Sequence, residues 1–282
     1  MGINVENVFH TYAKKTPFEY QALKGVTLEI KDGSFVAIIG QTGSGKSTLI
    51  QHLNAILLPD EGFLQIDEFK ITPEDTKTSY KNLRQHIGLV FQFSEYQLFE
   101  ETILKDVMFG PLNFDVPEDR AKELAGKYLQ LVGIGSDLFE KSPFDLSGGQ
   151  KRRVAIAGVL AMEPDIIVLD EPTAGLDPQG ATEMMNVFLD LKTNFHKTLI
   201  IVSHDMDFVY QYADEVILLS DGKKIFHQDK VSFFNNAQVY RYGIEKPQLL
   251  ALYETLFAKK SECFITYNKM IDFIVEAINH DK

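Results

Sequence analysis

The sequence has 282 residues, 28 of them basic and 40 acidic, so its formal charge is −12. Hydrophobic residues make up 45 % and charged residues 24 %, which is typical of a globular chain with a sizeable core in one or two domains. The acidic excess disfavours nucleic-acid binding through phosphate neutralisation. A single cysteine, Cys263, excludes an internal disulfide and favours a reducing compartment.

No apolar run approaches the roughly 18–20 residues that a membrane-spanning helix needs. Residues 1–10 also lack the basic and apolar regions of a secretory signal. We therefore expect a soluble intracellular protein that meets a membrane only through a partner.

The first segments of the chain predict β-structure. Residues 5–12 and 22–30 carry mixed alternation with β-branched residues, which indicates strands. Three short, continuous apolar runs indicate strands buried on both faces of a parallel sheet. These runs are residues 35–39, 166–169 and 199–202. Helical spacing over residues 181–195 separates the last two runs, so the alternation predicts an α/β core.

A different pattern interrupts this core. Residues 118–132 predict a helix, with Pro117 placed before its first turn. A loop rich in Gly, Ser and Pro follows, and residues 149–161 predict a second helix. We interpret this region as a mostly helical insert, spanning about residues 93–161, within the α/β domain.

The composition changes again after Lys230. Residues 231–282 contain six basic and six acidic residues, so the whole acidic excess lies in residues 1–230, with 22 basic against 34 acidic residues. The tail is also rich in aromatic residues. Apolar residues recur at helical spacing at Met270, Phe273, Ile274, Ala277 and Ile278. These features predict a small α-rich C-terminal domain over residues 231–282, with an accessory or dimerisation role.

A glycine-rich motif follows the apolar run at residues 35–39. Residues 40–47 match the phosphate-binding pattern G-x-x-x-x-G-K-[ST], in which backbone N–H groups surround a polyphosphate. Lys46 supplies positive charge to the outer phosphates, Ser47 offers a hydroxyl to Mg²⁺, and the following helix directs its N-terminus at the anion. The predicted nucleotide-binding residues here are Gly40, Gln41, Thr42, Gly43, Ser44, Gly45, Lys46, Ser47 and Thr48.

Two carboxylates end the buried strand at residues 166–169. A parallel strand delivers its carboxyl end to the ligand edge of the sheet, so Asp170 is placed to hold Mg²⁺ and Glu171 to activate water as general base. Acidic residues often merely end strands, so the pair alone is weak evidence for a catalytic site. The phosphate-binding motif earlier in the chain makes the functional interpretation the stronger one.

A third motif, L-S-G-G-Q at residues 146–150, precedes a predicted helix. Ser147 can cap this helix, and the two glycines allow close backbone approach by a partner. Arg152 and Arg153 follow on the same helix, and we interpret them as part of its solvated face.

Together these motifs resemble the ATP-binding subunits of ABC transporters. The phosphate loop, residues 146–150, the Asp170–Glu171 pair, the A-G-L-D sequence at residues 174–177 and His204 occur in that family's order over about residues 1–230. The resemblance implies a P-loop ATPase with a parallel-sheet core, an N-terminal antiparallel β subdomain and a helical signature subdomain. It also implies ATP and Mg²⁺ as ligands.

The resemblance further implies head-to-tail dimerisation with two nucleotides between the subunits. The residues implied to contact the partner's nucleotide are Ser147, Gly148, Gly149, Gln150 and Asp177. His204 would contact the γ-phosphate and orient the attacking water, and Gln92 would reach Mg²⁺ and link the site to the membrane subunit. Tyr12 would stack on adenine.

A narrower resemblance joins residues 91–102, residues 146–180 and the C-terminal extension to the second ATPase of energy-coupling factor importers of vitamins and some metal ions. It implies a dimer with a paralogous ATPase or with a second copy of the chain, peripheral at the cytoplasmic face of the membrane. An integral membrane coupling subunit would bind residues 91–102, and a substrate-binding membrane protein would act indirectly. The implied contact residues are Phe93, Tyr96, Leu98 and Phe99, unless at least two of them belong to the protein's own core.

Three other functions stay open. The chain could serve another ABC importer, act as an ABC ATPase on chromosomes, in repair or in translation, or be a dimerisation switch with little turnover. It lacks the long heptad insertions or second ATPase module typical of the soluble members. Glu171 and His204 both serve hydrolysis and argue against the switch, so we favour the importer ATPase. The transported substrate is not encoded in these residues.

Overall fold

The computed structural model describes residues 2–75, 80–257, 271, 272 and 275, and within them the strands form two sheets. The four-stranded sheet is antiparallel, in the order β2-β1-β4-β5. It consists of β1 (Gly2–Tyr12), β2 (Tyr20–Lys31), β4 (Glu61–Ile66) and β5 (Phe69–Ile71). The six-stranded sheet has the order β10-β9-β3-β8-β7-β6 and is parallel except for β10. It consists of β3 (Phe35–Ile39), β6 (Ile87–Val90), β7 (Ile166–Asp170), β8 (Thr198–Val202), β9 (Glu215–Ser220) and β10 (Lys223–Asp229).

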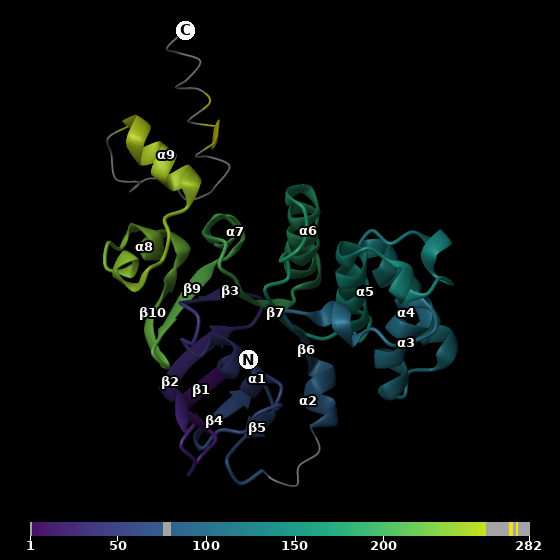
Figure 1. Cartoon of the computed structure of the whole chain (residues 1–282), viewed down its shortest axis with the longest axis horizontal. Helices are drawn as coiled ribbons and strands as arrows, with labels where there is room; N and C mark the ends of the chain where they lie inside the picture. Colours follow the sequence, from purple (N-terminus) through teal and green to yellow (C-terminus); the bar gives the residue numbers. More distant parts are fainter. Residues whose placement is uncertain (1, 76–79, 258–270, 273–274, 276–282) are drawn as a thin grey trace.

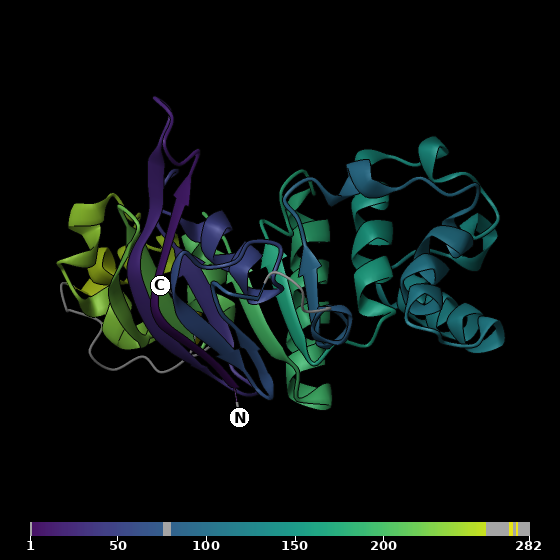
Figure 2. The ribbon, with the colours of Figure 1, turned by 90° about the horizontal axis from the view of Figure 1, so that it is seen from below.

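Helices surround these sheets and extend the molecule in two directions. They are α1 (Lys46–Leu53), α2 (Lys81–His86), α3 (Ile103–Asn113), α4 (Glu118–Leu131), α5 (Gly148–Leu160), α6 (Pro178–Phe195), α7 (Met206–Tyr212), α8 (Lys230–Asn235) and α9 (Gln248–Phe257). In Figures 1 and 2 the helices α3, α4 and α5 lie at one end of the long axis, and the C-terminal helices lie at the other end. None of the helices in the described part of the chain combines the length and apolar character that a membrane crossing needs.

The predicted fold class is confirmed: an α/β core carries an antiparallel sheet and a helical region. Strand β3 has the predicted bounds, because its five residues are all buried between two layers. Helix α6 begins three residues earlier than the spacing predicted, at Pro178. The Asp177 side chain caps it and proline occupies its first turn, where no backbone donor is lost.

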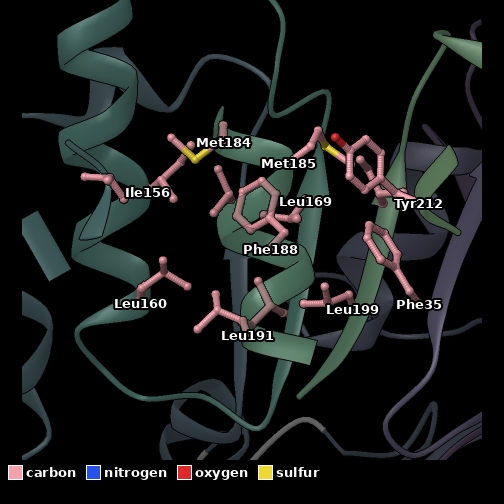
Figure 3. Packing of buried hydrophobic residues seen from close by; sticks show 14 of the residues in the cluster. Phe35, Ile156, Leu160, Leu169, Met184, Met185, Phe188, Leu191, Leu199 and Tyr212 are labelled. Atoms are coloured by element: carbon pink, nitrogen blue, oxygen red, sulfur yellow. The ribbon is translucent and has the colours of Figure 1, made fainter. Parts of the chain in front are cut away.

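The parallel strands of the six-stranded sheet are buried on both faces, and their side chains alternate between two hydrophobic clusters. In β3, Phe35 and Ile39 join one cluster, whereas Val36 and Ile38 join the other. Figure 3 shows the first cluster, in which residues of α5 and α6 meet those of β7 and β8, with Phe188 near its centre. The second cluster joins the sheet to α1 and to the antiparallel sheet.

The first part of the C-terminal segment shares this core. Phe233, Phe234 and Tyr253 are buried in the same cluster as Phe35, and the ring of Phe234 lies edge-on to that of Tyr210. A boundary at residue 230 stays a prediction. The helical spacing predicted over Met270, Phe273, Ile274, Ala277 and Ile278, and the lone Cys263, lie outside the described residues.

The interpretation of Arg152 and Arg153 as a solvated face is wrong. Arg152 is only 3 % exposed, and its Nε donates to the Pro172 carbonyl at 2.9 Å. Arg153 donates from Nη1 to the Val132 carbonyl at 2.8 Å and pairs with Glu183 at 3.0 Å. Helix α5 packs against α3, α4 and the turn after β7, so the guanidinium groups of both arginines meet carbonyl and carboxylate oxygens.

Helix α1 is anchored by a buried histidine. His52 is fully buried, and its Nδ1–H donates to the Thr48 carbonyl across 2.7 Å. Its ring lies 4.8 Å from that of His10. Burial lowers the pKa of His52 to about 4, and the Thr48 hydrogen bond only partly opposes this shift, so the imidazole is neutral at pH 7.

This neutral histidine predicts a pH-dependent stability. At pH values between the ordinary pKa of 6.5 and the folded-state pKa of about 4, His52 is protonated in the unfolded chain but not in the folded chain. Stability conferred by neutral His52 is thus lost as pH falls through this window, by roughly 3 kcal/mol in all. Urea unfolding at pH 6.5 and 4.5 should show a smaller difference for His52→Gln than for wild type. His196→Gln is the control, because His196 is exposed, and it should show the same difference as wild type. If the free energy of unfolding of His52→Gln depended on pH as that of wild type does, the assignment would be contradicted.

Candidate functional site

A cavity of about 330 Å³ opens where the parallel strands end. Its walls come from segments far apart in the sequence, because β3, β6, β7 and β8 all direct their carboxyl ends to one edge of the sheet. The lining residues are Tyr20, Ala22, Thr42, Gly43, Gly45, Lys46, Ser47, Thr48, Gln92, Asp170, Glu171, Val202 and His204. The structure therefore brings most of the predicted site residues together in one place.

The loop between β3 and α1 depends on glycine. Gly45 has φ +102°, and a Cβ there would lie 2.7 Å from the Ala22 carbonyl oxygen. A Cβ on Gly40, at φ +146°, would overlap the Leu219 carbonyl oxygen. No other residue fits either position. The loop leads directly into α1, and the free N–H groups and positive dipole end of this helix favour an anion.

Lys46 supplies the positive charge of this loop. Its Nζ donates to the carbonyls of Gly40 at 2.6 Å and Gln41 at 3.0 Å, so the ammonium is held against the loop. Burial lowers the pKa of Lys46, whereas the nearby carboxylates of Glu171 and Asp170 oppose that shift. A phosphate group is a suitable further partner for an ammonium held in this way.

Asp170 and Glu171 form the acidic wall of the cavity. Asp170 is the last residue of β7, and it accepts a hydrogen bond from the Ser47 hydroxyl. Burial raises the pKa of Asp170, and burial together with the Asp170 charge raises the pKa of Glu171 to about 7. Glu171 Oε1 lies 3.3 Å from His204 Nε2. A carboxyl group with a pKa near neutrality can exchange protons at working pH.

Two further predicted residues reach the cavity from the ends of neighbouring strands. His204 follows β8, and Gln92 follows β6. Burial lowers the pKa of His204, with Lys46 adding to the shift, which favours the neutral imidazole. Both side chains can therefore hydrogen-bond to a ligand without adding net charge.

Tyr12 lies beside the cavity rather than in its lining. Its hydroxyl is 3.2 Å from Thr48 Oγ1, and its ring lies edge-on to His10 with 4.6 Å between centroids. Tyr20 is not among the predicted residues, yet it lines the cavity and pairs with Tyr12 across β1 and β2, and its hydroxyl donates to the Gly43 carbonyl at 2.8 Å. The signal that could have found Tyr20 is the short connection between the strands, which places the two rings opposite each other.

The motif at residues 146–150 and Asp177 lie outside this cavity. Ser147 and Gln150 form a reciprocal capping box at the N-terminus of α5, with Ser147 N donating to Gln150 Oε1 at 3.1 Å. Ser147 and Gly148 are exposed there. Asp177 accepts a hydrogen bond from Gly180 N at 2.6 Å and so caps α6. Within one chain, these residues are thus separate from the phosphate loop.

The phosphate loop, the buried carboxylates and the histidine define a P-loop ATPase site, and comparisons with known proteins give the family. The family model described as ABC transporter matches residues 23–174. The energy-coupling factor transporter ATP-binding protein EcfA2 of Geobacillus kaustophilus is 48 % identical over 257 residues, covering 91 % of this chain and 89 % of the relative. EcfA2 of Lactobacillus gasseri is 51 % identical over 263 residues, covering 93 % and 89 %. The chain belongs to the ABC transporter ATPases, in the group of energy-coupling factor ATP-binding proteins.

Solved structures agree with this assignment. The cbiO1 protein of Clostridium perfringens, part of the ABC transporter complex cbiONQ, is 40 % identical and superposes with a TM-score of 0.73, covering 85 % of this chain and 92 % of the other. The ATP-binding cassette MJ0796, in a dimeric post-hydrolysis state bound to ADP and Pi, is 33 % identical with a TM-score of 0.74, covering 81 % and 98 %. The chain is an ATPase that binds ATP.

The loop geometry predicts a graded response to alanine. Gly45→Ala should weaken binding of a fluorescent ATP analogue by roughly fiftyfold or more, because the new Cβ meets backbone at a strained φ. Gly43→Ala is the matched control, since Gly43 also has a positive φ of +81° but no atom within 4 Å of the added Cβ. A loss of only about fivefold is expected there from backbone strain. Equal losses in the two variants would contradict this account of the loop.

Proposed function

We propose that this chain is the ATP-hydrolysing motor subunit of an energy-coupling factor importer, which drives uptake of vitamins or related micronutrients. The observation that carries the proposal is the meeting of the phosphate loop, Glu171 and His204 in one cavity, in a chain about half identical to proteins named EcfA2. In this role, ATP binding closes a pair of ATPase subunits and hydrolysis releases it.

The residues around the cavity have distinct tasks in hydrolysis. Backbone N–H groups of the loop and Lys46 bind the phosphates. Tyr12 and Tyr20 lie beside the loop, where they contact the adenine ring. Glu171 accepts a proton from water as the water oxygen attacks the γ-phosphorus, and the bond to the bridging oxygen breaks to give ADP and phosphate. His204, close to Glu171, orients that water and contacts the γ-phosphate.

The chemistry of the donor set fits a magnesium ion. The Ser47 hydroxyl, the Asp170 carboxylate and the Gln92 amide all supply oxygen atoms to the same cavity, and Mg²⁺ prefers oxygen ligands. The hydrogen bond from Ser47 to Asp170 shows that these two groups already converge. When bound, the ion neutralises charge on the outer phosphates.

A second ATPase subunit, either a paralogue or another copy of this chain, completes the site in this proposal. The exposed signature at the N-terminus of α5 presents Ser147, Gly148, Gly149 and Gln150 away from their own cavity. A helix N-terminus suits the γ-phosphate of a nucleotide held by the partner. Asp177, at the start of α6, is assigned to the same interface. The dimeric state of the similar MJ0796 cassette supports this arrangement.

An integral membrane coupling subunit is assigned to the surface around the turn Ser94–Gln97. Phe93, Tyr96 and Phe99 are 58 %, 83 % and 55 % exposed, whereas Leu98 is buried. The alternative, that at least two of these four belong to the core, is therefore wrong. Exposed aromatic residues gathered in one segment mark an interaction surface. Such docking places the chain peripherally at the cytoplasmic face of the membrane, with the substrate-binding membrane protein contacted only indirectly.

The assignment of the base predicts a separation of binding from turnover. Glu171→Gln should keep the affinity for the fluorescent ATP analogue within about twofold and lower steady-state hydrolysis by roughly a hundredfold or more, because an amide cannot accept the proton. Glu61→Gln, at an exposed position of β4, should leave both quantities unchanged. Undiminished turnover in Glu171→Gln would show that another group is the base.

The membrane assignment predicts a loss of co-purification. Tyr96→Ser should lower the amount of integral membrane protein recovered with the chain from detergent-solubilised membranes by about fivefold, since burial of an aromatic ring contributes strongly to such interfaces. Phe18 is equally exposed, at 83 %, on the connection between β1 and β2, and Phe18→Ser should have no effect. Recovery of the wild-type chain without any integral membrane protein would contradict the proposal.

A further inference from the structure

Arg152 is a buried arginine whose donors reach two separate segments of the chain, the turn after β7 and the turn Ser94–Gln97. Its Nε donates to the Pro172 carbonyl at 2.9 Å, and its Nη2 donates to the Glu171 carbonyl. Its Nη1 reaches Glu95 Oε2 at 3.4 Å. A buried guanidinium is retained only when its N–H groups find oxygen partners, and here two partners lie in the turn after β7 and one in the turn Ser94–Gln97.

One of these contacts bears directly on the candidate general base. Glu171 has φ +51°, a left-handed conformation that side chains other than glycine adopt at a cost in free energy. Such a conformation persists only where the surroundings hold it. Glu171 N donates to the Val202 carbonyl at 3.0 Å, and Arg152 donates to the Glu171 carbonyl, so the peptide groups on both sides of the Glu171 Cα are held. The direction of the Glu171 carboxylate therefore depends on the guanidinium.

The other end of the contact set lies at the surface assigned to the membrane subunit. Glu95 belongs to the turn Ser94–Gln97, directly before the highly exposed Tyr96. The side chain of Glu95 is 20 % exposed and points inward to Arg152, whose own side chain is 4 % exposed. A shift of this turn on docking thus reaches the guanidinium through one ion pair.

We propose that Arg152 is a positioning residue that links the turn Ser94–Gln97 to the backbone of Glu171, so that docking at the turn adjusts the catalytic carboxylate. The inference rests on the proposed function, because it takes Glu171 as the base and the turn as the docking surface. The planar fork of arginine serves the two carbonyls and Glu95 together, whereas a lysine ammonium at the same place is a point donor. Arg152 itself contacts neither nucleotide nor water in this scheme.

The test compares ATP hydrolysis by the full chain in the complex recovered from detergent-solubilised membranes. Arg152→Met should lower kcat at least tenfold and leave KM for ATP within twofold. Arg152→Lys should lose two- to fivefold in kcat, a partial rescue. Glu95→Gln, which spares the guanidinium contacts to Glu171 and Pro172, should lower kcat about threefold at unchanged KM. The double variant Arg152→Met with Glu95→Gln should be no slower than Arg152→Met alone, because both act through one contact set.

A purely structural arginine would behave differently. Arg153→Lys is the matched control, since Arg153 is the next residue of α5 and also bonds a carbonyl and a carboxylate. It should leave kcat and KM within twofold of wild type. Wild-type kcat in both Arg152→Lys and Glu95→Gln, or fully additive losses in the double variant, would overturn the inference. Arg152→Lys and Glu95→Gln keep the test decisive if Arg152→Met does not fold.

The inference and the function it rests on fail separately. Undiminished turnover in Glu171→Gln overturns the assignment of the base and the inference with it. Loss of turnover in Glu171→Gln together with wild-type kcat in the Arg152 and Glu95 variants overturns the inference alone.

Discussion

Burial of the six-stranded sheet on both faces is the constraint on which the site depends. Its parallel strands are short and mostly apolar, and their side chains alternate between two clusters, so a slip of one residue would exchange the two faces. Phe188, fully buried on one face, alone contributes roughly 2–3 kcal/mol through the water it excludes. This fixed register brings Gly40, Gln92, Asp170 and His204 to the same edge, although they are spread over more than half of the chain.

Charge on this protein acts locally rather than globally. The chain carries −12 overall, yet its cavity is built for a polyanion. Free N–H groups at the start of α1 and the Lys46 ammonium lie within the cavity, whereas charges separated from it by more than about 8–10 Å of solvent are screened at physiological salt. The same cavity holds the carboxyl groups of Asp170 and Glu171, whose pKa values burial raises, and the Asp170 charge adds to the shift of Glu171. The cavity can therefore bind a polyanion although the chain as a whole is acidic, because the nearest carboxyl groups ionise less readily than usual.

Sequence patterns predicted what depends on local order along the chain. The strand at residues 35–39, the phosphate loop and the carboxylates at the end of β7 follow from runs, spacing and glycine content, and the structure has them in those places. Such patterns do not predict contacts between residues that only the folded chain brings together. Arg152 is spaced as a surface residue and is buried because the turn after β7 and Glu95 close over it. Tyr20 lines the cavity only through its pairing with Tyr12. The residue roles themselves stay predictions.

Aromatic residues that follow β10 pack into the core of the ATPase. The family motifs all lie before residue 230, but Phe233, Phe234 and Tyr253 fill the cluster that also holds Phe35 at the base of the phosphate-loop strand. Gly243 is so close to Gln41 of the loop that a Cβ there would overlap the glutamine amide. Residues that share one core unfold together, so the cooperative unit extends past the end of the motifs. Phe233, Phe234 and Tyr253 thus share the core that carries the phosphate-loop strand, and loss of their packing would reach the ATP site through β3.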